Sequence, residues 1–156
     1  MNPAKRIAIV SLGALGIAAS TVAVTPLASA ASSANTAISA RQANFKKMGG
    51  AMKALKDELS GNADKAKMLA AAKTIAAVSR QQVKLFPAGT GPSSGVKTEA
   101  LAAIWTDRAT FDGEAKKLIA EADKLVAAVG TGNAGDQFKA VGATCGSCHR
   151  KFRQEH

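Results

Sequence analysis

Apolar residues, with two arginines among them, recur at intervals of three and four positions over three long stretches of this 156-residue chain. The first series is Ile38, Arg41, Phe45, Met48, Met52, Leu55 and Leu59; the second is Leu101, Ile104, Arg108, Phe111, Ala115, Leu118, Ala122, Leu125 and Val129; the third is Phe138, Val141, Cys145, Cys148 and Phe152. This spacing places the members of each series on one face of an α-helix. Residues 63–84 have a helical composition with a less regular apolar face. The pattern therefore predicts four helices.

Glycine, proline and asparagine mark the boundaries between these helices. Gly61 is expected to close the first helix, and Asn62 to cap the second with its side-chain oxygen. Residues 86–95 contain two prolines and three glycines, which predicts a loop. Gly132 is expected to end the third helix and Asn133 to cap the fourth. No strand pattern is present, and four helices with short connections predict an all-α fold, an antiparallel four-helix bundle.

Residues 1–30 have the pattern of a secretory signal peptide. Two basic residues precede an apolar run over residues 7–24, and the small residues that end at Ala30 resemble a signal-peptidase site. An uncleaved membrane anchor is the alternative, but glycine, serine and threonine interrupt the apolar run. We therefore expect export to a bacterial periplasm, cleavage after Ala30, and one mature domain at residues 31–156.

The chain is basic and poor in aromatic residues. Its formal net charge is +10, and removal of residues 1–30 would leave it at about +8. Such a charge favours acidic partners or membrane surfaces. The basic residues are spread singly along the chain, and export would remove nucleic acid as a ligand, so a solvated basic face explains the charge better than a nucleic-acid interface. We expect a redox partner protein to be acidic.

Residues 145–149, with the sequence CGSCH, hold both cysteines of the chain and one of its two histidines. Positions three apart share a helix face, so both thiols can reach the two vinyl groups on one edge of a porphyrin. The next residue then turns its imidazole over the ring, where a nitrogen can bind the iron. Cys145 and Cys148 are therefore the expected attachment points for haem c, and His149 is the expected axial iron ligand.

Two other chemistries remain open for the same cysteines. A CxxC pair can be a redox disulfide, although that motif usually opens a helix after a strand. The pair can also begin a zinc site, for which His156 would be a further ligand. The predicted export, the helical setting and the histidine next to Cys148 favour haem over both.

Two arginines in the predicted helices could interact with a haem. Arg41 stands between Ile38 and Phe45 on an apolar face, where a guanidinium needs an anionic partner or a route to water. A haem propionate would serve as that partner through paired charge-assisted hydrogen bonds, and a snorkelling side chain is the alternative. Arg153 lies one turn after His149, where it either flanks the proximal face of the iron or stabilises the helix C-terminus.

Several short motifs give the chain a resemblance to a known family. In order, they are Arg41-Gln42 with Phe45 and Met48-Gly49, then Ile104-Trp105, then Gly142 with CGSCHRKFR at residues 145–153. They span nearly the whole mature chain, which is similar to the cytochrome c-prime family, the four-helix class II c-type cytochromes. A CxxCH motif at the C-terminal end is itself fairly specific, because most other small c-type cytochromes carry it near the N-terminus.

The resemblance implies roles for the residues of the last helix. Cys145 and Cys148 would carry the thioethers, and His149 would bind the iron. Arg153 matches the basic residue that follows the proximal histidine by four positions. Many relatives have a tyrosine before that arginine, whereas this chain has Phe152, so a hydrogen bond to a phenol is absent here.

The resemblance also implies haem contacts from other parts of the chain. Arg41 and Gln42 match family residues that contact the haem propionates. Glu99 falls roughly where another haem contact is found. Phe45 matches the bulky residue that covers the distal side of the haem.

Phe45 would then determine the function. A phenyl ring has no lone pair for iron, and family members with an apolar residue here have five-coordinate, high-spin haem that admits small uncharged gases such as NO and CO. Another branch of the family is low-spin and uses a methionine thioether as the sixth ligand. Met48 and Met52 lie one and two turns beyond Phe45, so either could make the protein an electron carrier with closed iron, although such methionines more often fill a core.

The expected protein is thus a gas-binding haem protein that can also transfer electrons, and not an enzyme, because the first helix offers no distal proton donor except Arg41. The family typically forms antiparallel dimers through its first two helices, which implies a homodimer. A thiol-disulfide oxidoreductase that uses Cys145 and Cys148 remains the alternative from a different class.

Overall fold

The computed structural model describes residues 26–155, and their side chains from residue 31 onward. Five α-helices follow one another in this part of the chain: α1 (Pro26–Ser60), α2 (Lys65–Ser79), α3 (Ala103–Thr106), α4 (Arg108–Thr131) and α5 (Ala134–Phe152). Two short 3-10 helices, η1 (Val83–Leu85) and η2 (Pro92–Ser94), lie in the connection from α2 to α3. Most of the expected signal peptide lies outside the described residues, so its cleavage after Ala30 stays a prediction. No described helix combines the length and the apolar character that a membrane span needs.

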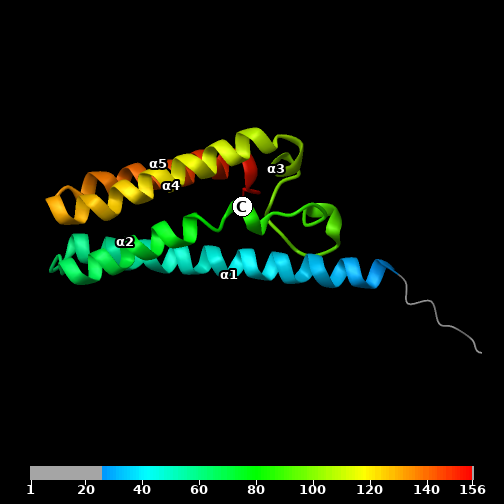
Figure 1. Cartoon of the computed structure of the whole chain (residues 1–156), viewed down its shortest axis with the longest axis horizontal. Coiled ribbons are helices and arrows are strands. Elements are labelled where there is room, and N and C mark those ends of the chain that lie inside the picture. The colour runs from blue at the N-terminus through cyan, green and yellow to red at the C-terminus, as the bar shows by residue number, and fades with distance from the viewer. Residues whose placement is uncertain (1–25, 156) are drawn as a thin grey trace, which may run out of the picture.

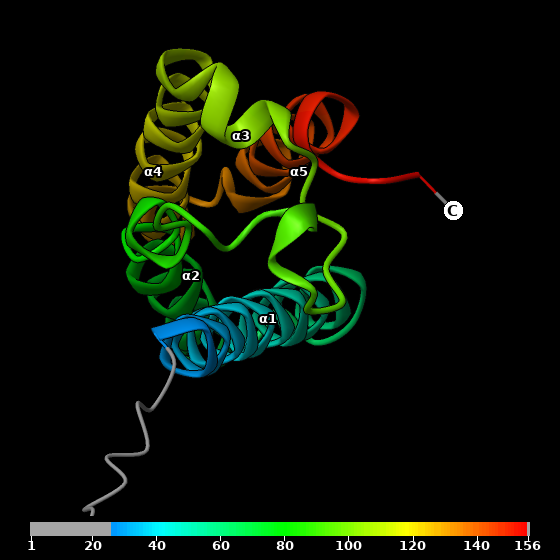
Figure 2. The same ribbon diagram turned by 90° about the vertical axis from the view of Figure 1, so that its right-hand side faces the viewer.

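The four long helices form two layers (Figure 1). α1 and α2 lie side by side in one layer and α4 and α5 in the other, and α2 also packs against α4. α1 and α5 form no comparable packed pair. Figure 2 shows the connection from α2 to α3 at the end of the bundle nearest the viewer, where it lies between α1 and α5. The structure confirms the predicted all-α four-helix bundle and adds α3 as a short extra helix.

Buried side chains form two clusters along the bundle. The larger cluster lies among the four long helices, and its fully buried members include Leu55, Ile75, Leu125 and Val141. The smaller cluster is aromatic, and its buried members are Phe86, Ile104, Phe111 and Phe152. The ring of Phe111 meets those of Phe86 and Phe152 edge to face, with centroid distances of 4.9 and 5.4 Å. The aromatic cluster thereby fixes the α2–α3 connection against α4 and the end of α5.

The prediction that Asn62 caps the second helix is wrong. Asp64 is the cap, because its side chain accepts hydrogen bonds from the backbone N–H groups of Ala66 at 2.9 Å and Lys67 at 3.1 Å. The amide of Ala63 bonds back to the last turn of α1, and this residue has a φ of 51°. The reversal of the chain direction therefore takes two more residues than the sequence pattern suggested.

The second apolar series, from Leu101 to Val129, does not form one continuous helix. Asp107 interrupts it with φ −125° and ψ 58°, and its side chain accepts a hydrogen bond from the amide of Thr110 at 3.3 Å. The apolar face nevertheless continues across the break, since Ile104 and Phe111 pack in the same cluster. The second helix is also shorter than expected and ends at Ser79. At Asp107, local capping has outweighed the periodic spacing of apolar residues.

The turn between α4 and α5 lies where the sequence analysis placed it. Gly132 ends α4 with a φ of 82°, a left-handed conformation that favours glycine. Asn133 occupies the N-cap position of α5 as expected, but its side chain makes no capping hydrogen bond. This tight turn sets α5, with both cysteines, directly against α4.

Candidate functional site

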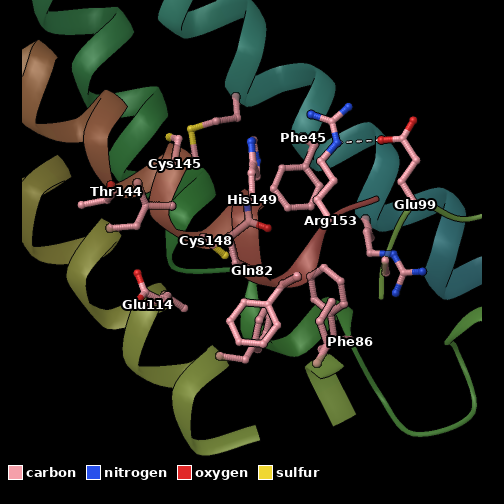
Figure 3. Close-up of a pocket in the computed structure, with 18 of the residues that line it drawn as sticks. Phe45, Gln82, Phe86, Glu99, Glu114, Thr144, Cys145, Cys148, His149 and Arg153 are labelled. Atoms are coloured by element: carbon pink, nitrogen blue, oxygen red, sulfur yellow. Dashed lines mark hydrogen bonds and ion pairs between the residues drawn. The ribbon is translucent and has the colours of Figure 1, made fainter. Parts of the chain in front are cut away.

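A cavity of about 730 Å³ lies between α1 and α5. α4 and the connection from α2 to α3 supply its other walls. The ten residues that the sequence assigned to haem attachment, haem contacts or the haem pocket all line this cavity: Arg41, Gln42, Phe45, Met48, Met52, Glu99, Cys145, Cys148, His149 and Arg153. Figure 3 shows Phe45 reaching in from α1 and His149 from α5. The cavity thus occupies the side of the bundle where α1 and α5 form no packed pair comparable to the other neighbouring helices.

Cys145 and Cys148 stand one turn apart on α5 and both line the cavity. Their thiols form no disulfide and are partly buried. Burial raises the pKa of both thiols, and for Cys148, where the negative charge of Glu114 adds to the effect, the pKa rises to about 11. Both groups are therefore protonated near neutral pH, whereas a redox-active or nucleophilic cysteine needs a low pKa.

His149 follows on the same helix and its imidazole lies at the same cavity. Burial is the main cause that lowers the pKa of His149; the cation of Arg153 lowers it further, and Glu99 acts in the opposite direction. The neutral imidazole is therefore favoured. A neutral ring keeps a nitrogen lone pair that can bind a metal.

Arg41 projects from α1 and is only 3% exposed. Its guanidinium donates hydrogen bonds to the carbonyl of Thr90 at 2.9 Å and to the hydroxyls of Thr90 and Thr98 at 3.3 and 2.8 Å. These partners are uncharged, and burial lowers the pKa of Arg41. The side chain is therefore not the snorkelling arginine that was the alternative interpretation. A buried guanidinium with uncharged partners is well suited to receive a carboxylate.

Gln42, Glu99 and Arg153 stand at more exposed positions around the cavity. Gln42 donates a hydrogen bond to the carbonyl of Lys97 at 3.4 Å. The guanidinium of Arg153 pairs with the carboxylate of Glu99 at 2.8 Å, and both side chains are nearly half exposed (Figure 3). The amide of Gln154 bonds to the carbonyl of Glu99 at 2.8 Å. These contacts tie the segment before α3 to the end of α5.

Phe45, Met48 and Met52 form the α1 wall of the cavity. Phe45 is 40% exposed and meets the ring of Phe86 edge to face, with the centroids 6.3 Å apart. Met48 is buried in the larger core cluster, and Met52 packs against that cluster. The phenyl ring is therefore the least enclosed of the three side chains. The two methionines have the apolar neighbours of core residues.

The sequence analysis missed two buried polar residues in the cavity wall. Gln82 is 4% exposed, and neither its Nε2 nor its Oε1 has a hydrogen-bond partner among the described residues. Glu114 is 3% exposed, and its Oε2 likewise lacks such a partner. The helical spacing of apolar residues could have indicated that both face the core. Gln82 continues the spacing of Ile75 and Val78, and Glu114 follows Phe111 by three positions.

Comparison with known proteins identifies the family. A sequence profile described as cytochrome c′ matches residues 36–153. The chain belongs to the cytochrome c′ family. The cofactor is therefore one covalently attached haem c with its iron.

Several relatives cover much of the chain. The cytochrome c′ of Allochromatium vinosum is 33% identical over 147 residues, and the match covers 91% of this chain and 92% of the relative. The cytochrome c-556 of Agrobacterium tumefaciens is 34% identical over 117 residues, with 72% of this chain and 93% of the relative covered. Among solved structures, the cytochrome c′ from Thermochromatium tepidum has a TM-score of 0.72 at 30% identity and covers 78% of this chain and 97% of its own.

The cavity of this cytochrome c′ family member has the chemistry that haem c requires. Two thiols one turn apart, a neutral imidazole and a buried guanidinium gather at a volume within the range of about 300–1,000 Å³ for ligand sites. A Cβ atom added to Gly49 or Gly142 would meet nothing within 4 Å, so both the α1 and the α5 walls leave room for a flat ring. Among the described residues, no three or more His, Cys, Asp or Glu side chains could hold a metal ion by themselves, and His156 of the zinc alternative lies outside these residues.

Proposed function

We propose that Cys145 and Cys148 form the two thioethers to the haem and that His149 is the axial ligand of its iron. The convergence of these three side chains with Arg41 on one cavity carries the proposal. The bound haem would supply one-electron chemistry and a binding position for small ligands. The protein contributes attachment, a neutral imidazole and an enclosing apolar wall.

The same cavity supports roles for the polar residues around the haem. Arg41 would receive a propionate, because its guanidinium is buried against uncharged hydrogen-bond acceptors. Gln42 lies on the next position of α1 and would reach the same edge of the haem from a more exposed position. Glu99 and Arg153 would close the neighbouring edge through their ion pair.

We further propose five-coordinate, high-spin iron that binds NO and CO. Phe45 supports this because its ring lines the cavity and offers no lone pair to the metal. A solved structure of a cytochrome c prime variant from Alcaligenes xylosoxidans, with a TM-score of 0.70 at 25% identity, is described as a nitric oxide complex. An incoming gas would have to displace the phenyl ring, which favours small uncharged ligands over larger or anionic ones.

A low-spin electron carrier with a methionine ligand is the second candidate. Met48 and Met52 line the same cavity, which favours this alternative. Both also pack in or against the apolar core, so a thioether that moved to the iron would leave apolar contacts behind. We therefore place the methionine-ligated state second.

The cellular setting completes the proposal. Export and cleavage after Ala30 would place the mature protein in the periplasm, where it would bind gas or exchange electrons with an acidic redox partner rather than act as an enzyme. A homodimer is also proposed. One cytochrome c′ structure with a TM-score of 0.73 at 30% identity is described as having a ligand-controlled dimer dissociation.

Mass spectrometry and absorption spectra of the exported protein test the proposal. Expression with functional haem-attachment machinery should add one haem to the mature chain, and the ferrous protein should show a single broad Soret band that changes with NO. Sharp, split visible bands before any gas is added would instead support methionine ligation. A chain that emerges without haem and with a titratable disulfide would support the thiol oxidoreductase and overturn the proposal. Replacement of both Cys145 and Cys148 by serine should abolish attachment.

A further inference from the structure

Glu114 is a buried acid that the proposed function does not use. It lies on α4, is 3% exposed and lines the cavity. Figure 3 shows it reaching from α4 toward the part of α5 that carries Thr144 and Cys148. Burial of a carboxylate is unfavourable unless charges or hydrogen bonds compensate for the lost water. Its contacts therefore indicate what it does.

The contacts of Glu114 reach α5 next to the proposed iron ligand. Its Oε1 accepts a hydrogen bond from the ammonium of Lys151 on α5 at 2.9 Å and from that of Lys117 on α4 at 3.2 Å. Lys151 lies two residues after His149. One side chain of α4 thus holds α5 just beyond the residue that presents the imidazole.

Water reaches the carboxylate of Glu114 much less than it reaches the two lysine ammonium groups that pair with it. The side chain of Glu114 is 2% exposed, whereas those of Lys151 and Lys117 are 48% and 66% exposed. A charge in the protein interior acts more strongly on its neighbours than charges of the opposite sign that lie in water. The Oε2 atom has no hydrogen-bond partner among the described residues. Solvent therefore screens this carboxylate from the cavity less than it screens the two ammonium groups that pair with it.

We propose that Glu114 is a positioning residue for the haem, which holds α5 at Lys151 against α4 and places a fixed negative charge beside the cavity that favours ferric over ferrous iron. This inference rests on the proposed attachment of haem at Cys145 and Cys148. Ferric haem carries one more positive charge than ferrous haem, so a nearby negative charge lowers the potential of this one-electron couple. The lysines oppose that effect, and their removal should strengthen it.

Spectroelectrochemical titration of three haem-loaded variants tests the inference against the wild type. Glu114→Gln keeps the shape of the side chain and removes its charge, and it should raise the reduction potential. Lys151→Gln leaves the carboxylate with one cation fewer, and it should lower the potential. The opposite signs are the decisive result, because a merely structural loosening of α5 would move both variants in the same direction.

Glu121→Gln is the matched control. Glu121 also links α4 to α5, through Gln137 at 2.6 Å, and pairs with Lys124 at 2.8 Å, but it does not line the cavity. It lies seven residues from Glu114, about 10 Å along the helix. Its replacement should leave the potential unchanged. Should Glu114→Gln fail to fold, Glu114→Met takes its place in the comparison of signs with Lys151→Gln.

Two outcomes overturn the inference. Unchanged potentials in both cavity variants would show that Glu114 does not act on the haem, and shifts of the same sign would reduce it to a packing residue. Failure of the proposed function would look different, because the wild-type protein itself would then carry no covalently bound haem.

Discussion

The guanidinium carbon of Arg41 lies 4.6 Å from the centre of the Phe86 ring. The first residue belongs to α1 and the second to the connection between α2 and α3, so this contact joins two segments that lie far apart in the sequence. The same guanidinium holds Thr90 and Thr98 by hydrogen bonds. Arg41, which the sequence analysis proposed as a partner of a haem propionate, therefore also holds the α2–α3 connection against α1.

Arg41→Met should loosen this connection. The substitution keeps an apolar stem and removes hydrogen bonds from a buried charged donor, so we expect the free energy of unfolding to fall by about 1–3 kcal/mol. Denaturant titration of the haem-loaded protein measures the change. Gln42→Met, at the exposed neighbouring position, should lower stability by less than about 0.5 kcal/mol. Equal losses in the two variants would contradict the role of Arg41 as an anchor.

Phe45→Ala should speed the association of CO. Truncation of the ring that lines the cavity removes the side chain that a gas must displace, and we expect a gain of about tenfold, equivalent to about 1.4 kcal/mol of barrier. Flash photolysis or stopped-flow mixing gives the rate. Leu101→Ala is the control, because Leu101 is similarly exposed and does not line the cavity. An unchanged rate in Phe45→Ala would remove this residue as the gate.

His149→Ala should leave the haem attached to the chain but alter its iron ligation. The proposed thioether bonds are made to the cysteine sulfurs, whereas the ligand-field bands in the absorption and magnetic circular dichroism spectra report the axial ligand. Added free imidazole should restore a nitrogen-ligated spectrum. The matched control is His156→Ala, which removes the other histidine and should leave the spectrum as in the wild type. Unaltered ligation in His149→Ala would exclude it as the axial ligand.

Acid should remove the stabilising effect of Glu114. Its pKa is lowered from the ordinary value of 4.5 to about 2, first through the hydrogen bond from Lys151, so the folded state binds its proton more weakly than the unfolded state. The contribution to stability is therefore complete above pH 4.5 and is lost as the pH falls toward 2. Unfolding free energies of wild type and Glu114→Gln should differ most near neutral pH and converge in acid. A difference that stays constant from pH 6 to pH 2.5 would show that the carboxylate does not titrate in this range.

The bundle, and the gathering of the proposed haem residues of α5 at one cavity, could be predicted from the sequence because both depend on local spacing. Intervals of three and four positions defined the apolar helix faces, and the same spacing placed Cys145 and Cys148 on one side of α5. The helix boundaries were less predictable, since they depend on competition between neighbouring polar groups. Asp64 and Asp107 each accept backbone hydrogen bonds that a pattern of apolar residues does not reveal.

The polar wall of the cavity could not be predicted with the same success. Gln82 and Glu114 are in register with apolar residues, but a single polar residue on an apolar face is equally consistent with a side chain that reaches water. Only the three-dimensional arrangement shows that both are buried at the cavity. The partners of Glu114 come from α5, so their contact depends on how α4 and α5 pack.

Because α1 and α5 form no packed pair comparable to those of the other neighbouring helices, the exposed part of the α1 wall can change with little effect on α5. Met48 and Met52 are poor positions for such a change, since both pack in or against the core that α5 shares. Exchange of Phe45, the least enclosed of the three side chains, would be a practical starting point for retuning ligand preference.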